Sequence, residues 1–179
     1  MSAQPSPFRH CPQCAHPSTC TSAREFRCEH CDFRYFHNVA AAVSVFMVHD
    51  GHLLLTRRAH APAAGTLDLP GGFVDPDESL EEALARELHE ELDLTVLPGD
   101  MRYLFSLPNR YPFAGITYRT ADSFYRLDYP ARPAVQARDD VAAVMWVALE
   151  KINADDIGLE SVRAAVERFL RVGRQAMSE

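Results

Sequence analysis

The chain has 179 residues, of which 47% are apolar and 24% are charged, and its formal net charge is −7. This composition fits one globular domain with a small extra module, and it excludes a collagen-like chain, a coiled coil and a largely disordered protein. The longest apolar run, residues 39–48, is too short to cross a bilayer, no secretory signal is recognised, and the acidic balance disfavours broad nucleic-acid binding, so we expect a soluble cytoplasmic protein.

All five cysteines lie before residue 32, and four of them form two equally spaced pairs, Cys11 with Cys14 and Cys28 with Cys31. Two such knuckles present four thiolates tetrahedrally, as a structural Zn²⁺ site requires. A redox pair and secreted disulfides are the alternatives, and the equal spacing in a cytosolic chain favours zinc. We expect residues 1–37 to form a zinc ribbon with strands at 25–27 and 33–36, in which Cys20 takes no part.

The rest of the chain, residues 38–179, mixes strand and helix patterns without regular alternation. Period-two and apolar patterns indicate strands at 39–48, 53–57, 101–107, 116–127 and 141–147. Residues 66–69 are expected to be extended, and Pro70-Gly71-Gly72 predicts a turn. A closing helix is expected to carry an apolar face of Val162, Val166, Phe169 and Leu170. The mixture predicts an α+β fold with a mixed sheet.

The clearest helix is expected at residues 79–92. Ser79 followed three residues later by Glu82 predicts a capping box at its start. Its apolar arc consists of Leu80, Ala83 and Leu84. Glu81 and Glu82 fit a solvated run of charge at the helix start.

Three further glutamates of this helix do not fit a solvated face. Glu87 and Glu91 fall within the apolar arc one turn apart, and Glu90 lies at its edge. Carboxylates on a buried face are costly unless they are paired or bind a metal, and neighbouring carboxylates repel one another. An all-oxygen ligand set of this kind predicts a site for Mg²⁺ or Mn²⁺.

These residues carry a resemblance to a known family. From Gly72 the chain reads glycine, five residues, Glu78, seven residues and then Arg86-Glu87-Leu88-His89-Glu90-Glu91-Leu92-Asp93-Leu94, which resembles the Nudix box at eight of nine specified positions. The departure is Asp93, where the family has glycine. Aspartate tolerates the left-handed turn expected there better than most residues, so we expect a small cost in stability and intact carboxylates.

The resemblance implies a Nudix-type mixed sheet sandwiched by helices, a zinc ribbon before it, and hydrolysis of a pyrophosphate-type linkage. It implies that Mg²⁺ or Mn²⁺ is held by Glu87, Glu90, Glu91 and the Gly71 carbonyl. Arg86 would pair with Glu78 to orient this cluster. The proton of the attacking water would pass to Glu90 or to a downstream acid, for which Asp140 matches a loop position of the family. A surface acid without such a role is the alternative for Asp140.

The arrangement of a zinc ribbon ahead of the box resembles that of the bacterial NADH pyrophosphatase subfamily, whose members also cleave the NAD cap of RNA. The subfamily motif after the box is degenerate in residues 106–113, which carry an insertion and no tryptophan. Tyr111 and Phe113 would stack a nucleobase and Arg110 would contact phosphate, or all three pack in the core or at a dimer surface. NAD(H) or ADP-ribose is the leading substrate class, with NAD-capped RNA possible.

Other functions stay open at this point. Diadenosine polyphosphates are alternative substrates, and a nucleotide-sensing module without catalysis is the alternative class, although sensors of this kind lose the carboxylates that this chain keeps. Isoprenoid-diphosphate isomerisation would need a cysteine near the site, and every cysteine lies in the ribbon region. A homodimer is expected from the related pyrophosphatases.

Overall fold

The protein is described from a computed structural model, which describes residues 8–17, 22 and 24–176. The chain divides into two compact units, Met1–Val39 and Ala40–Glu179, and each is described by itself. A division into a ribbon and a second domain at residues 37 and 38 stays a prediction. Among the residues described, no helix is both long enough and apolar enough to cross a membrane.

The first unit contains two short antiparallel strands, β1 (Glu25–Arg27) and β2 (Arg34–Phe36). Its small core consists of the buried residues Cys11, Phe26 and Cys28, against which the other cysteines of the two knuckles pack. Phe8 and Phe33 also pack against this core. Domains with a core this small usually need disulfides or a metal, and the expected zinc site stays a prediction.

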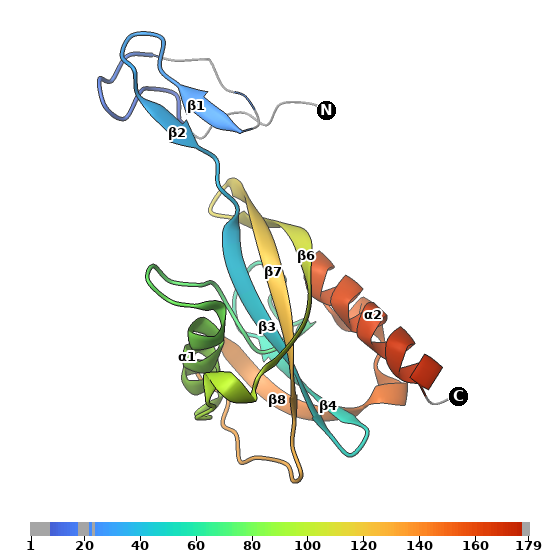
Figure 1. Cartoon of the computed structure of the whole chain (residues 1–179). Helices are drawn as coiled ribbons and strands as arrows, with labels where there is room; N and C mark the ends of the chain where they lie inside the picture. The colour runs from blue at the N-terminus through green and yellow to red at the C-terminus, as the bar shows by residue number, and fades with distance from the viewer. Residues whose placement is uncertain (1–7, 18–21, 23, 177–179) are drawn as a thin grey trace. The chain divides into compact units, whose positions relative to one another are not determined.

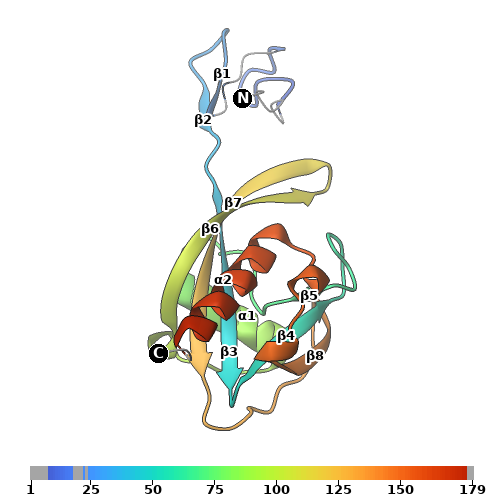
Figure 2. The same ribbon diagram turned by 90° about the vertical axis from the view of Figure 1, so that its right-hand side faces the viewer.

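The second unit is built on a six-stranded mixed sheet (Figures 1 and 2). Its strands are β3 (Ala40–His49), β4 (His52–Arg58), β5 (Leu67–Asp68), β6 (Arg102–Phe113), β7 (Ile116–Asp128) and β8 (Val141–Ala148). The order along the sheet is β5-β4-β3-β7-β6, and β8 pairs with β4. The pair β3–β7 is parallel, whereas the other pairs are antiparallel.

Two helices cover opposite faces of this sheet, α1 (Leu80–Leu92) and α2 (Glu160–Ala176) (Figure 1). Alternate residues of β3 divide between them: Val43, Val45 and Met47 pack toward α1, and Phe46 and Val48 pack toward α2. A strand buried on both faces needs apolar residues at nearly every position, which explains the run recognised at residues 39–48, where Ser44 is the polar exception. Three short 3-10 helices complete the unit, at Pro98–Asp100, Leu149–Lys151 and Ala154–Asp156. The expected α+β fold is confirmed.

The structure corrects three local predictions. Residues 70–73 do not form a tight turn but run along β3, since Val45 donates to the Pro70 carbonyl and Val43 to the Gly72 carbonyl. Residues 106–113 continue β6 as a strand paired with β7. Glu81 is half-buried and accepts a hydrogen bond of 2.7 Å from the Tyr125 hydroxyl, so it is not part of a fully solvated run. Each error has the same origin, because the deciding partner is distant in sequence.

Candidate active site

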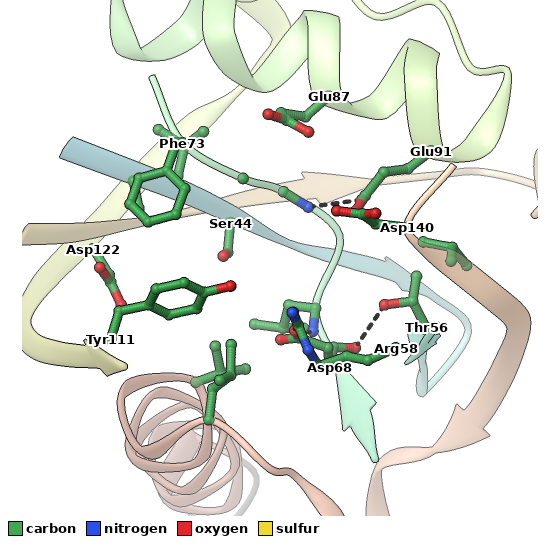
Figure 3. Close-up of a pocket in the computed structure, with 18 of the residues that line it drawn as sticks. Ser44, Thr56, Arg58, Asp68, Phe73, Glu87, Glu91, Tyr111, Asp122 and Asp140 are labelled. Atoms are coloured by element: carbon green, nitrogen blue, oxygen red, sulfur yellow. Dashed lines mark hydrogen bonds and ion pairs between the residues drawn. The ribbon is translucent and has the colours of Figure 1, made fainter. Parts of the chain in front are cut away.

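A pocket of about 260 Å³ lies in the second unit between the sheet, α1 and the loop that precedes α1 (Figure 3). This volume is below the roughly 300–1,000 Å³ that encloses a drug-sized ligand, so the pocket would hold only part of a larger substrate. Eight acidic residues line it: Asp68, Asp75, Glu87, Glu90, Glu91, Asp122, Asp139 and Asp140. Among the lining residues, Arg58 is the one with a positive charge. The lining is therefore predominantly acidic.

Local sequence signals position α1 against this pocket. The Ser79 hydroxyl accepts a hydrogen bond from the Glu82 amide, and the Glu82 carboxylate accepts one of 2.8 Å from the Ser79 amide, which forms the expected capping box. The buried Leu84 and Leu88 fix the rotation of the helix on the sheet. With this rotation Glu87 and Glu91 point toward the pocket, as Figure 3 shows.

The loop before the helix makes close contacts through two glycines. Gly71 has a φ of 137°, and a Cβ atom there would collide with the backbone of β3. A Cβ atom on Gly72 would collide with the carboxylate of Glu87. The Gly71 amide donates a hydrogen bond of 3.0 Å to Glu91 Oε2. The loop thus runs directly against the two carboxylates. The carbonyls of Pro70 and Gly72 accept hydrogen bonds from β3, whereas the Gly71 carbonyl takes no part in these bonds.

Arg86 connects the carboxylates of this region. Its Nε and Nη2 donate to the two oxygens of Glu78 at 2.7 and 3.0 Å. Its Nη1 donates to Glu87 and to Glu90, at 2.9 Å each. The Arg86 guanidinium holds the pKa of Glu78 below its usual value. The structure therefore forms the Arg86–Glu78 pair expected from the resemblance, and it adds direct contacts to two of the three glutamates.

The three glutamates differ in burial. Glu91 is 8% exposed, and desolvation raises its pKa well above the usual value. Burial also raises the pKa of Glu87, against the opposing effect of Arg86. The Glu90 side chain is 46% exposed and lies at the rim. The carboxylate oxygens of these glutamates do not converge on one point. Among the described residues, the group of possible metal ligands whose atoms all lie within 4.8 Å of one another is made of cysteines.

Asp139 and Asp140 reach the pocket from the loop that precedes β8. The Asp140 carboxylate lies 3.8 Å from His60 Nε2, with both side chains well exposed. Asp140 is therefore at the site, as expected, and it is open to water. Asp139 was not singled out in the sequence.

The far wall of the pocket was missed in the sequence. Arg58 Nη1 donates to Asp68 Oδ2 at 2.7 Å, and Asp122 accepts from Asn109, Thr120 and Ser161. Burial raises the pKa of Asp68. Asp68 stands between Leu67 and Leu69, and this was the signal available for it, because a buried acid needs partners. Asp122 lies among the polar residues of β7, so no such signal was available for it in the sequence.

The three residues expected to bind substrate fall in different places. Tyr111 lines the pocket, with its ring 5.3 Å from that of Phe73 in an edge-on arrangement, and its hydroxyl points inward (Figure 3). Phe113 stacks on Tyr111, with 6.3 Å between ring centroids, and is 53% exposed. Neither Arg110 nor Phe113 lines the pocket. Of the three, Tyr111 alone is placed to touch a ligand inside it.

The four paired cysteines converge in the first unit. Their sulfur atoms all lie within 4.8 Å of one another, and the pairs Cys11–Cys31 and Cys14–Cys28 are both 3.7 Å apart. Tetrahedral Zn²⁺ with bonds of about 2.3 Å requires sulfur atoms about 3.8 Å apart. The four thiols are free, and the Cys28 sulfur accepts from the amides of His30 and Cys31. The geometry fits zinc, and Cys20 lies outside the described residues.

The NUDIX domain family matches residues 38–169 of this chain. The chain is 36% identical over 105 residues to the NAD-capped RNA hydrolase NudC of Edwardsiella ictaluri, which covers 58% of this chain and 40% of that protein. It is also 36% identical over 80 residues to the ADP-ribose pyrophosphatase of Methanocaldococcus jannaschii, which covers 45% of this chain and 47% of that protein. The matched region thus spans less than half of either relative.

Solved structures show the same fold. The NUDIX hydrolase from Nitrosomonas europaea aligns with a TM-score of 0.65 at 20% identity, covering 92% of this chain and 91% of that one. The bifunctional NMN adenylyltransferase/ADP ribose pyrophosphatase from Francisella tularensis, complexed with AMP and a manganese ion, aligns with a TM-score of 0.60 at 22% identity. That alignment covers 78% of this chain and 42% of that one.

Proposed function

The chain belongs to the NUDIX domain family of hydrolases, and from this premise we propose that it hydrolyses a pyrophosphate linkage in a nucleoside diphosphate derivative with the help of divalent cations. The proposal combines the box residues with the geometry of the pocket around them. Mg²⁺ or Mn²⁺ is the catalytic cofactor, and Zn²⁺ in the cysteine site is structural.

The observation that carries the proposal is the charge of the pocket. A pyrophosphate is an anion, and the lining has eight acids and one arginine that is already paired with Asp68. Such a ligand can enter only with cations that neutralise both the carboxylates and the phosphate oxygens. Glu91 supports this, since it is buried and its hydrogen-bond donor is the Gly71 amide, and no basic side chain among the described residues forms an ion pair with it. A hard divalent cation satisfies such a carboxylate.

The ligands we assign to the cations are Glu87, Glu90, Glu91 and the Gly71 carbonyl. Bound there, divalent cations neutralise phosphate charge and lower the pKa of a coordinated water. Arg86 holds Glu87 and Glu90 through one nitrogen, while Glu78 anchors its other side. This arrangement fixes two of the ligands before substrate arrives, which is the role of residues behind a metal site.

The proton of the attacking water goes to a carboxylate of the site, for which we assign Asp140 or Glu90. Both line the pocket and both are partly exposed, so each can exchange its proton with solvent between turnovers. The water oxygen forms the new bond to phosphorus as the anhydride P–O bond breaks, and the leaving phosphate departs as a monoester.

NAD(H) or ADP-ribose is the substrate class we assign. Support comes from the relatives named NAD-capped RNA hydrolase and ADP-ribose pyrophosphatase. Tyr111 and Phe73 also offer an aromatic wall at the pocket on which a planar ring can pack. NAD-capped RNA belongs to the same class by its linkage. Dinucleoside polyphosphates are the alternative substrates, and a nucleotide sensor is the alternative function.

The other assignments follow from the same residues. The cysteine unit stabilises its own fold through zinc and takes no part in chemistry, because four thiolates leave no open coordination position. Free thiols of this kind suit the reducing cytoplasm. A homodimer remains an expectation.

The proposal is tested by incubating the protein with Mg²⁺ or Mn²⁺ and a panel of NADH, NAD⁺, ADP-ribose, diadenosine polyphosphates and nucleoside triphosphates. We expect AMP and the matching mononucleotide from NADH, or AMP and ribose phosphate from ADP-ribose. Turnover of only the diadenosine polyphosphates would replace the substrate class. Binding of these nucleotides without turnover of any of them would favour the sensor.

A further inference from the structure

Helix α1 ends in an unusual way for this sequence pattern. Asp93 follows its last residue and adopts the left-handed conformation, with a φ of 56° and a ψ of 33°. Glycine takes this conformation without steric cost, whereas a side chain is strained there. An aspartate at this position therefore calls for a compensating interaction.

The Asp93 carboxylate forms a bidentate ion pair with Arg138, which is distant in sequence. Arg138 Nη1 donates to Oδ1 at 2.7 Å, and Nη2 donates to Oδ2 at 2.8 Å. Two parallel hydrogen bonds fix both the distance and the orientation of the two groups. Glycine at position 93 could not make this contact.

Backbone hydrogen bonds join the same two segments. The Gln136 amide donates to the Leu92 carbonyl at 3.0 Å, and the Arg138 amide donates to the Glu91 carbonyl at 2.9 Å. Residues 136–138 are thus attached to the last turn of α1, including the backbone of the buried Glu91. The ion pair between Asp93 and Arg138 adds a third contact between these segments on the solvent side, where both side chains are a little over 40% exposed.

The attached segment leads directly into the pocket. Asp139, with a φ of 49°, and Asp140 follow Arg138 and both line the pocket. The Asp140 carbonyl accepts from the Ala59 amide at 2.8 Å, which holds the other end of the segment. Glu87 and Glu91 line the same pocket, so negative charges of the helix and of the loop face one common space, and in their ionised form these carboxylates disfavour a close approach of the loop. A positive group that anchors the loop to the helix opposes this repulsion.

We propose that the Asp93–Arg138 ion pair is a positioning device that holds Asp139 and Asp140 at the pocket beside Glu87 and Glu91. The inference rests on the proposed hydrolase function, for which it assigns two further residues outside the reacting groups. Because the pair is exposed, it contributes little to global stability. Its contribution is the placement of a proton acceptor, to which catalytic rates are sensitive at the scale of 1 Å.

The test compares Asp93→Gly, Arg138→Gln and the double variant. Asp93→Gly is informative because it relieves the left-handed strain and removes the anchor in one change. We expect kcat to fall about tenfold in each single variant with KM within about twofold, and the double variant to lose no more than either single one. The unfolding temperature should stay within about 3 °C of the parent. Arg126→Gln breaks an exposed ion pair with Asp128 and a contact of Arg126 with the Phe169 ring, both outside the pocket, so it is the control and should leave kcat unchanged.

A second readout does not depend on activity. Hydrogen exchange at the Arg138 and Ala59 amides should become faster in Asp93→Gly and stay unchanged in Arg126→Gln. Parental kcat in both single variants, or losses that multiply in the double variant, would overturn the positioning role. If the parent protein hydrolyses nothing, the proposed function fails, and the exchange rates still decide whether the pair anchors the loop.

Discussion

Glu91 shows why a carboxylate can be kept at a position where it weakens the fold. It is 8% exposed, it accepts a hydrogen bond from the Gly71 amide, and burial raises its pKa. Without metal, the folded protein binds the Glu91 proton more tightly than the unfolded chain does. The stability of the metal-free protein therefore falls as the pH rises from the ordinary carboxyl range through the raised pKa.

Replacing this residue should separate stability from activity. Glu91→Gln keeps an oxygen for the Gly71 amide and removes the buried charge, so we expect a higher melting temperature for the metal-free variant at pH 8. Turnover in Mg²⁺ should fall by at least about a hundredfold, because a metal ligand is lost. Calorimetry and steady-state kinetics measure the two effects.

Glu87→Gln should lower turnover in the same way, with substrate binding less affected than kcat. Glu150→Gln is the matched control, since Glu150 is exposed and lies outside the pocket. Unchanged turnover in both Glu87→Gln and Glu91→Gln would contradict the assignment of the metal site.

Some residues of the site could be predicted from the sequence and others could not. Glu87, Glu91 and the Arg86–Glu78 pair lie on one helix or just before it, so helical spacing and the box identify them. Arg58, Asp68 and Asp122 come from three different strands and meet only through the sheet. The ion pair between Asp93 and Arg138 could not be predicted either, because the sequence shows that Asp93 replaces the glycine but does not show that Arg138 lies beside it.

Elements were predicted best where their own residues decide their structure. The capping box predicted the start of α1, and the apolar run at residues 39–48 predicted β3. The segment 70–73 was wrongly expected to turn, since its glycines serve close contact with β3 and Glu87 instead. Strand β6 is longer than expected because its second half, with Pro108 and Pro112, is held by pairing with β7.

The cysteine knuckles allow a prediction for the first unit. Cys14→Ser should lose zinc and make residues 1–39 sensitive to proteases, because the core of this unit is too small without the metal. The second unit should keep its fold, since it has its own cores on both faces of the sheet. Zinc analysis and limited proteolysis measure both effects.

Cys20→Ser is the control for this variant, and we expect it to retain one zinc ion per chain. A Cys14→Ser protein that keeps its zinc and its protease resistance but loses all turnover would contradict the structural role of this site.

At the scale of the whole molecule, charge is concentrated where the chemistry is proposed. Eight of the 25 acidic residues line one pocket, and among the residues that the structure describes Arg58 is the basic residue that lines it with them. The composition alone showed only a net charge of −7. Folding gathers these carboxylates into one pocket, and we propose that divalent cations bound there let an anionic substrate enter. The central claim is therefore that activity requires divalent metal in this pocket.

The most direct measurement is the release of AMP from ADP-ribose or NADH by zinc-retaining protein from which other divalent metals have been dialysed. We predict no release until Mg²⁺ or Mn²⁺ is added, a return of turnover on addition, and no return in the variant with both Glu87→Gln and Glu91→Gln. Equal release with and without added cation, or full activity of the double variant, would contradict the account.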